Sequence, residues 1–441
     1  MRTCTLVAPT ILGLGLALAA CGGDDAATPD VDAGVYPPMA DLTRDIVDTG
    51  LDVDLATKTA TATITLAPSM STGASFEVGD LTITSVTHDG APLMYAVANE
   101  QLDVGTPPTT APLTLTIAYG FRTHEDSDGL DSDGFTLIWP YYCGNLFPCH
   151  SHPSDGTRFE LAVHGQAAGT VVAPPVIPAD APSYMIAWAV GDYTRLELGT
   201  TTAGTKVGMW YGPSEEAAAR AGGAHLTFAF DWLEQHVGPY LFGNTVGSVS
   251  ARWGRNAYGG MEHHPYWHVA SIALGDESVN IHEASHGWWG DGVRIRCWED
   301  FVLSEGTATY YEGRLLEEAG ATQASQTAWR AVDQQLATWR SGNGGGVAWP
   351  QSCGEVDVLA DGLFSEVPYV KGAAFLRAVE QKIGRATFDE AMQTFYGRWK
   401  AKAAGMADLL AVFREVSGYD PTACAQLWLV NRAVPPLAPC A

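Results

Sequence analysis

The pentapeptide HEASH, residues 282–286, holds two histidines four positions apart. On a helix of 3.6 residues per turn, side chains with this spacing leave the same face about one turn from each other. Both imidazoles can therefore reach one metal ion. A core helix seldom buries two imidazoles and a carboxylate without a cation to share them. The spacing therefore predicts a helical metal site at His282 and His286.

A third metal ligand is expected from a second helix. Glu305 opens a helical pattern that runs from Glu305 to Leu316. Two histidines and one carboxylate fill three positions of a tetrahedral zinc site and leave the fourth open for water, as catalytic zinc sites require. The alternative is a chance HExxH in a chain with 12 His, which the position of Glu305 weakens. We therefore expect one Zn²⁺ ion held by His282, His286 and Glu305.

Two further glutamates could assist such a site. Glu283 is adjacent to a ligand and need not be one itself. It could accept the proton of a metal-activated water as a general base and later deliver it to the leaving amine. Glu312 follows Glu305 by two turns on the same helical face, so it is a candidate acceptor for the second N–H of a ligand imidazole. A surface position for Glu312 is the alternative.

These residues lie within a longer series of motifs. HEASH is followed by WWGD and by WEDFVLSEGTATYYE around Glu305, with GGMEH at 259–263 and PYVKG at 368–372. Upstream stand LFPCHSHPSDGTRFELAV and SYMIAWAVGDY. In this order the motifs resemble those of the M1 metallopeptidases, the gluzincin family of aminopeptidase N and leukotriene hydrolase. The resemblance runs from about residue 45 to the C-terminus.

The resemblance implies substrate-binding roles. Tyr369 of PYVKG would donate a hydrogen bond to the oxyanion that forms on the scissile carbonyl. Gly259, Gly260, Met261 and Glu262 would bind the substrate, and Glu262 would hold its free α-amine.

This sequence departs from the family pattern in two places. His263 replaces the usual Asn after Glu262, and the family's glutamine partner has no evident match before LFPC. The family's C-terminal helical domain also has no counterpart, so we expect a short form with a more open site. His263, His264 and His268 could suggest a second metal, but a polar cleft rim is the simpler interpretation.

Residues 1–21 are typical of a bacterial lipoprotein signal. Arg2 is followed by an apolar run from Leu6 to Ala20, and small residues precede Cys21. We expect lipidation of Cys21, with ordinary cleavage as the alternative. Residues 22–42 indicate a flexible acidic linker. These features predict a bacterial membrane lipoprotein on the periplasmic or cell-surface face.

The rest of the chain divides in two. Apolar residues alternate with threonines and turn residues between 43 and 203, which predicts a β-sandwich or saddle-like domain. From 204 to 441 the pattern favours a mainly helical, thermolysin-like catalytic domain, and hence an α+β fold. We expect helices from Ser214, as N-cap, to Gly238, from Lys371 to Ile383, from Thr387 with Glu390 as its capping-box partner, and from Met406 to Val416.

Charge and cysteine content bound the partners. The net charge of −26 without a Lys/Arg run argues against nucleic acid. An acidic loop could hold a structural Ca²⁺ near Asp126–Asp133, although a solvated turn is the simpler interpretation. Without Cys4 and Cys21, six cysteines allow fifteen pairings. Proximity favours Cys143 with Cys149 and Cys424 with Cys440, leaving Cys297 with Cys353.

The combined prediction is a zinc metallopeptidase that releases N-terminal residues from peptides. One alternative is a zinc endopeptidase, or a hydrolase of another carbonyl substrate, without amine recognition. The other is a non-catalytic surface-binding lipoprotein. The sequence leaves the side-chain preference and the oligomeric state open.

Overall fold

A computed structural model describes residues 36–124, 128–132, 134–138, 142–253, 259–342, 345–354, 356, 365–435 and 440. All of them belong to one compact unit. Cys21, Asp126 and Asp133 lie outside the described residues, so the lipid anchor and the calcium site stay predictions. No helix within the described ranges has the length and apolar character needed to cross a bilayer.

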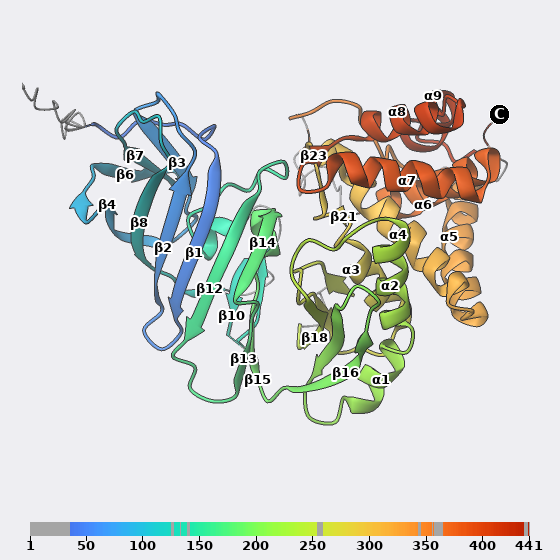
Figure 1. The fold of residues 1–441 in the computed structure, drawn as a ribbon, viewed down its shortest axis with the longest axis horizontal. Coiled ribbons are helices and arrows are strands. Elements are labelled where there is room, and N and C mark those ends of the chain that lie inside the picture. The colour runs from blue at the N-terminus through green and yellow to red at the C-terminus, as the bar shows by residue number, and fades with distance from the viewer. Residues whose placement is uncertain are drawn as a thin grey trace, which may run out of the picture. The chain divides into compact units, whose positions relative to one another are not determined.

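The period-two segments of the N-terminal region form a 7-stranded sheet (Figure 1). The apolar residues of β2 (Thr59–Leu66) are buried, and the threonines between them are half-buried or exposed. β2 pairs along its whole length with β8 (Leu113–Gly120), so the alternation directs both apolar rows to one face. The other strands are β14 (Val176–Ala181), β12 (Thr157–His164), β1 (Ile46–Asp54), β4 (Thr82–His88) and β5 (Ala91–Pro92).

Smaller sheets complete this region, which confirms its predicted β character. One contains β3 (Gly73–Glu77), β7 (Gln101–Gly105) and β6 (Tyr95–Ala98). Another contains β11 (Thr136–Ile138), β10 (Asp128–Asp131) and β9 (Thr123–His124), and a third pairs β13 (Thr170–Val172) with β15 (Ala189–Gly191).

A 5-stranded sheet opens the second region. Its order is β16 (Thr194–Thr200), β17 (Lys206–Tyr211), β18 (Thr245–Ala251), β20 (His268–Ala270) and β19 (Gly260–Met261). Because β16 pairs with β17, this sheet starts before residue 204, where the sequence pattern changes. The edge strand β19 carries part of GGMEH.

The single helix expected from Ser214 to Gly238 is wrong. The structure has two helices here, α1 (Glu216–Gly222) and α2 (Leu226–His236), and Ser214 has a φ of 72° instead of capping. A Cβ on Gly222 would lie 1.9 Å from the carbonyl oxygen of Leu274. The helix therefore breaks where glycine permits close packing.

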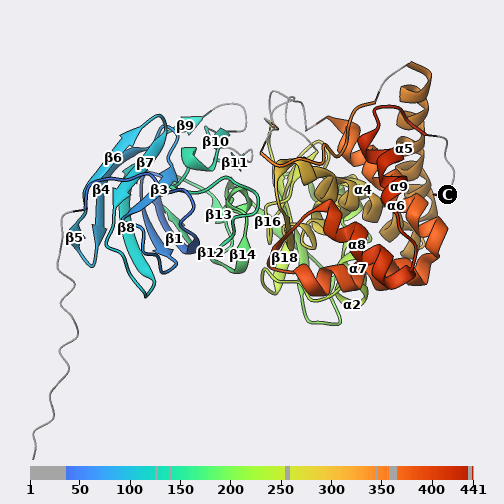
Figure 2. The same ribbon diagram turned by 90° about the horizontal axis from the view of Figure 1, so that it is seen from above.

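The remaining chain is mainly helical, which confirms the α+β prediction (Figures 1 and 2). The helices are α3 (Glu277–Ser285), α4 (Phe301–Glu318), α5 (Thr322–Gly342), α6 (Glu366–Ile383), α7 (Arg385–Trp399), α8 (Met406–Ser417) and α9 (Thr422–Ala425). Short strands β21 (Trp289–Gly290), β22 (Val293–Ile295) and β23 (Ala403–Ala404) form a further sheet. Helical turns also occur at Cys143–Asn145, Ser183–Met185, Trp298–Asp300 and Gln426–Val430.

Several predicted helix boundaries need correction. α4 starts at Phe301, before Glu305, and α6 starts at Glu366, before Lys371. α7 follows Gly384 directly and not a capping box at Thr387. In contrast, α6 ends at Ile383 before Gly384 as predicted.

Helices α4 and α6 meet backbone to backbone. A Cβ on Gly306 would lie 2.6 Å from the Cα of Gly372, and one on Gly372 would lie 2.5 Å from the Cα of Gly306. Only glycine allows this approach. It brings the helical turns that carry Glu305 and Tyr369 together.

The two disulfides favoured by sequence proximity, Cys143–Cys149 and Cys424–Cys440, are present, and so is Cys297–Cys353, the pair that they leave. Cys297 stands just before α4, and Cys353 lies in the connection between α5 and α6. This disulfide therefore ties together two segments that lead into helices of the candidate site.

A buried cation also joins these helices. The guanidinium of Arg314, on α4, is 2 % exposed and lies 2.9 Å from Glu318, 3.4 Å from Glu380 and 3.1 Å from Asp389. Arg385 contacts the same Glu380 from a position that is 45 % exposed.

We expect Arg314→Ala to lower the free energy of unfolding by about 3–5 kcal/mol, because three partly buried carboxylates lose the buried counter-charge that they share. Arg385→Ala is the matched control and should cost less than about 1 kcal/mol, since its ion pair is solvent-screened. Urea denaturation measures both. Equal losses for the two variants would contradict a special role for the buried guanidinium.

Candidate active site

The helix that carries both histidines has a defined start. The Oδ1 of Asp276 accepts a hydrogen bond of 2.9 Å from the backbone N–H of Ser278 and caps α3. His282 lies in the last turn of α3, and His286 is its C-cap residue in αR conformation. Their Nε2 atoms are 3.2 Å apart, so both imidazoles point to one place.

Glu305 of α4 completes the group. Its Oε2 is 3.2 Å from the Nε2 of His282 and 3.4 Å from the Nε2 of His286. Ligands at about 2.0–2.1 Å from a tetrahedral zinc ion are separated by roughly 3.3–3.4 Å, the edge of the tetrahedron. The triangle of donor atoms therefore has the size that one zinc ion requires.

The second nitrogen of each imidazole also has a partner. The Nδ1 of His286 lies 2.8 Å from the carbonyl oxygen of Trp289, and donation to this acceptor leaves the Nε2 lone pair for a metal. The Nδ1 of His282 lies 3.6 Å from Glu312. The structure thus places Glu312 beside a predicted ligand, on the side away from Glu305.

Two buried carboxylates adjoin the triangle. Glu262, Glu283 and His286 each offer an atom within 4.8 Å of the others. Burial raises the pKa of Glu283 to about 8 and also raises the pKa of Glu262. A Cβ on Gly260 would lie 2.5 Å from the Oε1 of Glu283, so glycine is needed where β19 passes this carboxylate.

One cavity of about 870 Å³ contains the predicted site residues, including Gly259, Gly260, Met261 and Tyr369. The ring of Tyr369 stacks on the imidazole of His282, with centroids 6.0 Å apart and planes at 16°. Phe301 contacts Tyr369 edge-on at 6.1 Å. α5, which the sequence did not predict, also lines the cavity through Val332, Gln335 and neighbours.

The sequence assigned no role to Tyr184 and Asp291. The Tyr184 hydroxyl donates to Oδ1 of Asp291 over 3.2 Å, and the backbone N–H of Asp291 donates to the carbonyl of His286 over 3.2 Å. Asp291 is fully buried, and burial raises its pKa well above the ordinary value. Tyr184 lies in the motif SYMIAWAVGDY and Asp291 in WWGD, and these motifs are the only features of the sequence that point to the two residues.

The three histidines that follow Glu262 are buried. The Nδ1 atoms of His263 and His268 lie 3.1 Å apart. His264 approaches the carbonyl oxygen of Glu283 with Nε2 at 2.8 Å and the hydroxyl of Tyr240 with Nδ1 at 2.8 Å. Burial lowers the pKa of His264 and of His268 to about 3, so both are neutral. His264 therefore joins the GGMEH segment to α3.

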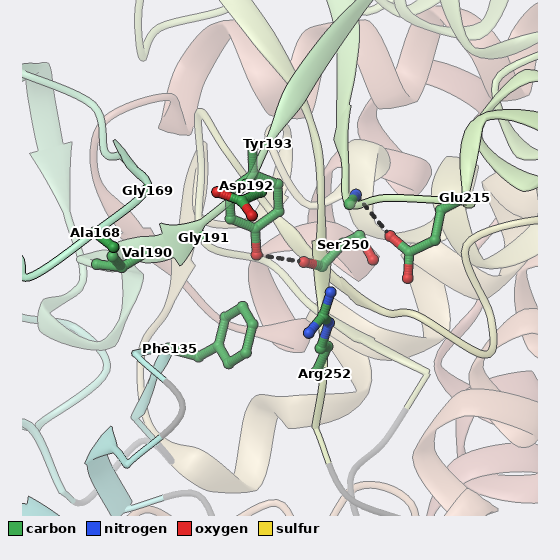
Figure 3. A pocket seen from close by; sticks show the side chains of 11 residues that line it. Phe135, Ala168, Gly169, Val190, Gly191, Asp192, Tyr193, Glu215, Ser250 and Arg252 are labelled. Atoms are coloured by element: carbon green, nitrogen blue, oxygen red, sulfur yellow. Dashed lines mark hydrogen bonds between the residues drawn. The ribbon is translucent and has the colours of Figure 1, made fainter.

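A smaller cavity of about 320 Å³ lies elsewhere (Figure 3). Tyr193 donates to the carbonyl of Ser250 over 2.7 Å, and Glu215 accepts from the N–H of Gly212 over 2.8 Å. Arg252 and Phe135 also line it. It contains none of the predicted site residues.

The metal-free site is protonated near neutral pH. Burial favours the neutral form of His286, but the charges of Glu305 and Glu262 outweigh it and raise the pKa to about 9. His282 also has a raised pKa, because its contacts with Glu305 and Glu312 outweigh burial. Burial opposes ionisation of Glu305, yet the two histidines lower its pKa to about 2.

We expect zinc binding at pH 7 to release between about one and two protons, because the ion needs the lone pairs that the imidazolium protons occupy. Affinity should rise with pH from 7 towards 9, because His286, whose pKa is about 9, and His282, whose pKa is also raised, lose their protons. Titration calorimetry in buffers of different ionisation enthalpy measures the release. Proton-neutral binding would contradict this charge assignment.

Comparison with known proteins adds sequence relatives. Residues 270–428 match the family model described as the peptidase family M1 domain. A leucine aminopeptidase 2 from Sclerotinia sclerotiorum is 27 % identical over 66 % of this chain and 52 % of that protein. A leukotriene A-4 hydrolase homolog from Botryotinia fuckeliana is 28 % identical over 65 % of this chain and 48 % of that protein. The chain thus spans about half the length of these curated relatives.

Solved structures share the fold. The crystal structure of an M1 zinc metallopeptidase from Deinococcus radiodurans superposes with a TM-score of 0.74 at 19 % identity, and the match covers 89 % of this chain and 95 % of that chain. A mutant of that enzyme bound to a Tyr-Ser-Ala substrate matches with a TM-score of 0.76 at 18 % identity, covering 89 % and 95 % of the two chains. The chain is thus similar to peptidase family M1 over residues 270–428, a segment that includes His282, His286 and Glu305, and it shares its overall fold with these solved structures.

Proposed function

We propose that the protein is a zinc aminopeptidase that removes residues from the N-terminus of peptides. The observation that carries the proposal is the convergence of three groups on one cavity: the donor triangle, Glu283 and Glu262. Family M1 implies a zinc ion and a peptide substrate. The curated relatives include proteins named leucine aminopeptidase, and a structural neighbour is bound to a tripeptide substrate.

His282, His286 and Glu305 would hold the ion. Zinc supplies a Lewis acid that lowers the pKa of a water molecule towards about 7. Glu283 would accept a proton from the attacking water as the water oxygen bonds to the scissile carbonyl carbon. Glu283 then delivers the proton to the amide nitrogen as the C–N bond breaks, so that an amine and a carboxylic acid leave. Tyr369, stacked on His282, donates a hydrogen bond to the oxyanion.

Glu262 and β19 would position the substrate. β19 stands at the end of its sheet and pairs with β20 on one side, while Gly259, Gly260 and Met261 line the cavity. Its other edge can therefore align an extended peptide. The carboxylate of Glu262 would then bind the ammonium group of the first residue, which fixes cleavage after that residue.

An endopeptidase is the second candidate, because His263 replaces the Asn of the family motif. The imidazole of His263 instead contacts that of His268, with the two Nδ1 atoms 3.1 Å apart. The two candidates share the metal chemistry and differ only in their dependence on Glu262.

We expect Glu283→Gln to reduce kcat/KM by roughly a hundred- to ten-thousandfold, because general-base catalysis is lost. The zinc content, measured by metal analysis, should stay at that of the wild type. The matched control is Glu390→Gln on the exposed side of α7, which should leave kcat/KM unchanged. Wild-type hydrolysis by Glu283→Gln would refute the mechanism.

We expect Glu262→Gln to lower kcat/KM for free-amine peptides by roughly ten- to a hundredfold, the value of a charge-assisted hydrogen bond. N-acetylated versions of the same peptides should be poor substrates for wild type and variant alike. Mass spectrometry of the products measures both rates. Comparable cleavage of acetylated and free peptides by the wild type would favour the endopeptidase.

A further inference from the structure

The smaller cavity, of about 320 Å³, lies at the carboxyl ends of two adjacent parallel strands, β17 and β18. β17 ends just before Gly212, and Glu215 follows in the same connection. Ser250 lies near the end of β18, and Arg252 directly follows that strand. Open α/β sheets commonly bind ligands in the crevice outside such strand ends. The cavity is therefore placed where a sheet of this type can hold a small molecule.

The buried hydroxyl of Ser250 has no partner in the described part of the protein. Ser250 is 2 % exposed and lines the cavity, yet its Oγ makes no hydrogen bond there. Its backbone carbonyl, in contrast, accepts a hydrogen bond of 2.7 Å from Tyr193. A hydroxyl that leaves water without a partner destabilises a fold. The Oγ atom therefore points to a ligand that supplies the missing hydrogen bond.

Two opposite charges approach one point of the cavity without pairing. A Cβ on Gly212 would lie 3.2 Å from the Oε2 of Glu215 and 3.4 Å from the Nη2 of Arg252. The same Oε2 accepts the N–H of Gly212 over 2.8 Å, which fixes the carboxylate. Among the residues that the structure describes, however, Arg252 has no ion-pair or hydrogen-bond partner. The guanidinium is thus available to a ligand beside a fixed carboxylate.

Apolar side chains form another part of the lining. Phe135 and Val190 lie on the left in Figure 3, and Glu215 lies on the right. Phe135 is 4 % exposed and belongs to a small buried apolar cluster, so its ring is held in place. A ligand bound by the charged groups can therefore place an apolar side chain against these residues.

The balance of charge indicates the ligand class. Among the described residues that line this cavity, the charged side chains are Asp192, Glu215 and Arg252. Two carboxylates and one guanidinium disfavour an inorganic anion such as phosphate, because the carboxylates repel it. They suit a small molecule that carries one positive and one negative charge close together.

We propose that the smaller cavity is a second ligand site, which binds a free α-amino acid with an apolar side chain. The α-carboxylate pairs with Arg252 and accepts a hydrogen bond from Ser250. The α-ammonium group donates to Glu215, and the side chain lies against Phe135 and Val190. The site lies outside the metal cavity, so the proposal does not depend on the peptidase function.

Titration calorimetry of the zinc-loaded full chain with L-leucine tests the site. The metal cavity also admits leucine, as a product of the proposed reaction, so variants assign the binding. Ser250→Ala and Arg252→Gln should weaken one binding component by about ten- to a hundredfold, because each removes a hydrogen bond to a charged group. Glu262→Gln, which changes the other cavity, should keep that component.

The matched control is Arg220→Gln. Arg220 lies on α1 with its side chain 62 % exposed, outside the cavity, and its removal should leave the component unchanged. Thermal unfolding shows that the variants are folded. Ser250→Ala should be no less stable than the wild type, since it deletes a hydroxyl without a partner.

Two analogues of leucine test recognition of both charges. L-Leucinamide lacks the carboxylate, and N-acetyl-L-leucine lacks the ammonium group. Each should bind at the Ser250-dependent component at least about tenfold more weakly than leucine. Equal affinity for N-acetyl-L-leucine would mean a carboxylate site without amine recognition and would overturn the proposal.

The remaining outcomes separate this site from the proposed function. If the wild type shows no leucine binding, or if folded Ser250→Ala and Arg252→Gln bind leucine like the wild type, the second site is refuted. If no unblocked peptide is hydrolysed while the Ser250-dependent binding persists, the aminopeptidase function fails and the second site stands.

Discussion

Two imidazoles and one carboxylate, those of His282, His286 and Glu305, converge in this fold within 3.4 Å of one another, and this convergence is the constraint on which the candidate site depends. At such distances, two imidazoles and a carboxylate need either a shared cation or bound protons. The surrounding chain supplies what the ion would need: Trp289 accepts from one imidazole, Glu312 lies beside the other, and the cavity faces the open side.

Backbone contacts hold this arrangement in place. His264 lies against the carbonyl of Glu283 and thereby joins the GGMEH segment to α3, while Gly260 leaves room for the Glu283 carboxylate. Asp291 joins the end of the histidine helix to Tyr184 of the β-rich region. The site is thus assembled from segments far apart in sequence. Each segment is held by a buried polar contact or by close packing against a glycine.

The chemistry-bearing residues could be predicted because spacing on a helix determines which side chains share a face. This rule sufficed for His282 and His286 of HEASH, whereas Glu305 was proposed from a second helical pattern and Glu262 and Tyr369 from the resemblance to family motifs. Proximity in sequence suggested two of the disulfides and left the third pair. α5 was missed because few of its residues are buried: Ser325, Val332 and Leu336. The break between α1 and α2 was missed because it depends on the contact of Gly222 with Leu274, which is distant in sequence. Thr387 does not cap α7, because Gly384 follows the end of α6 and directly precedes α7. Tertiary contacts decided each of these cases.

The glycine pair at the crossing of α4 and α6 has a consequence for how this protein can vary. Gly306 and Gly372 touch through their Cα atoms, one residue from Glu305 and three from Tyr369. A methyl group at either position would wedge the helices apart and displace both functional residues in one step. No compensating change at the other position can make space, since that position is already glycine. Single substitutions at these two glycines are therefore disfavoured, although neither residue takes part in the proposed reaction.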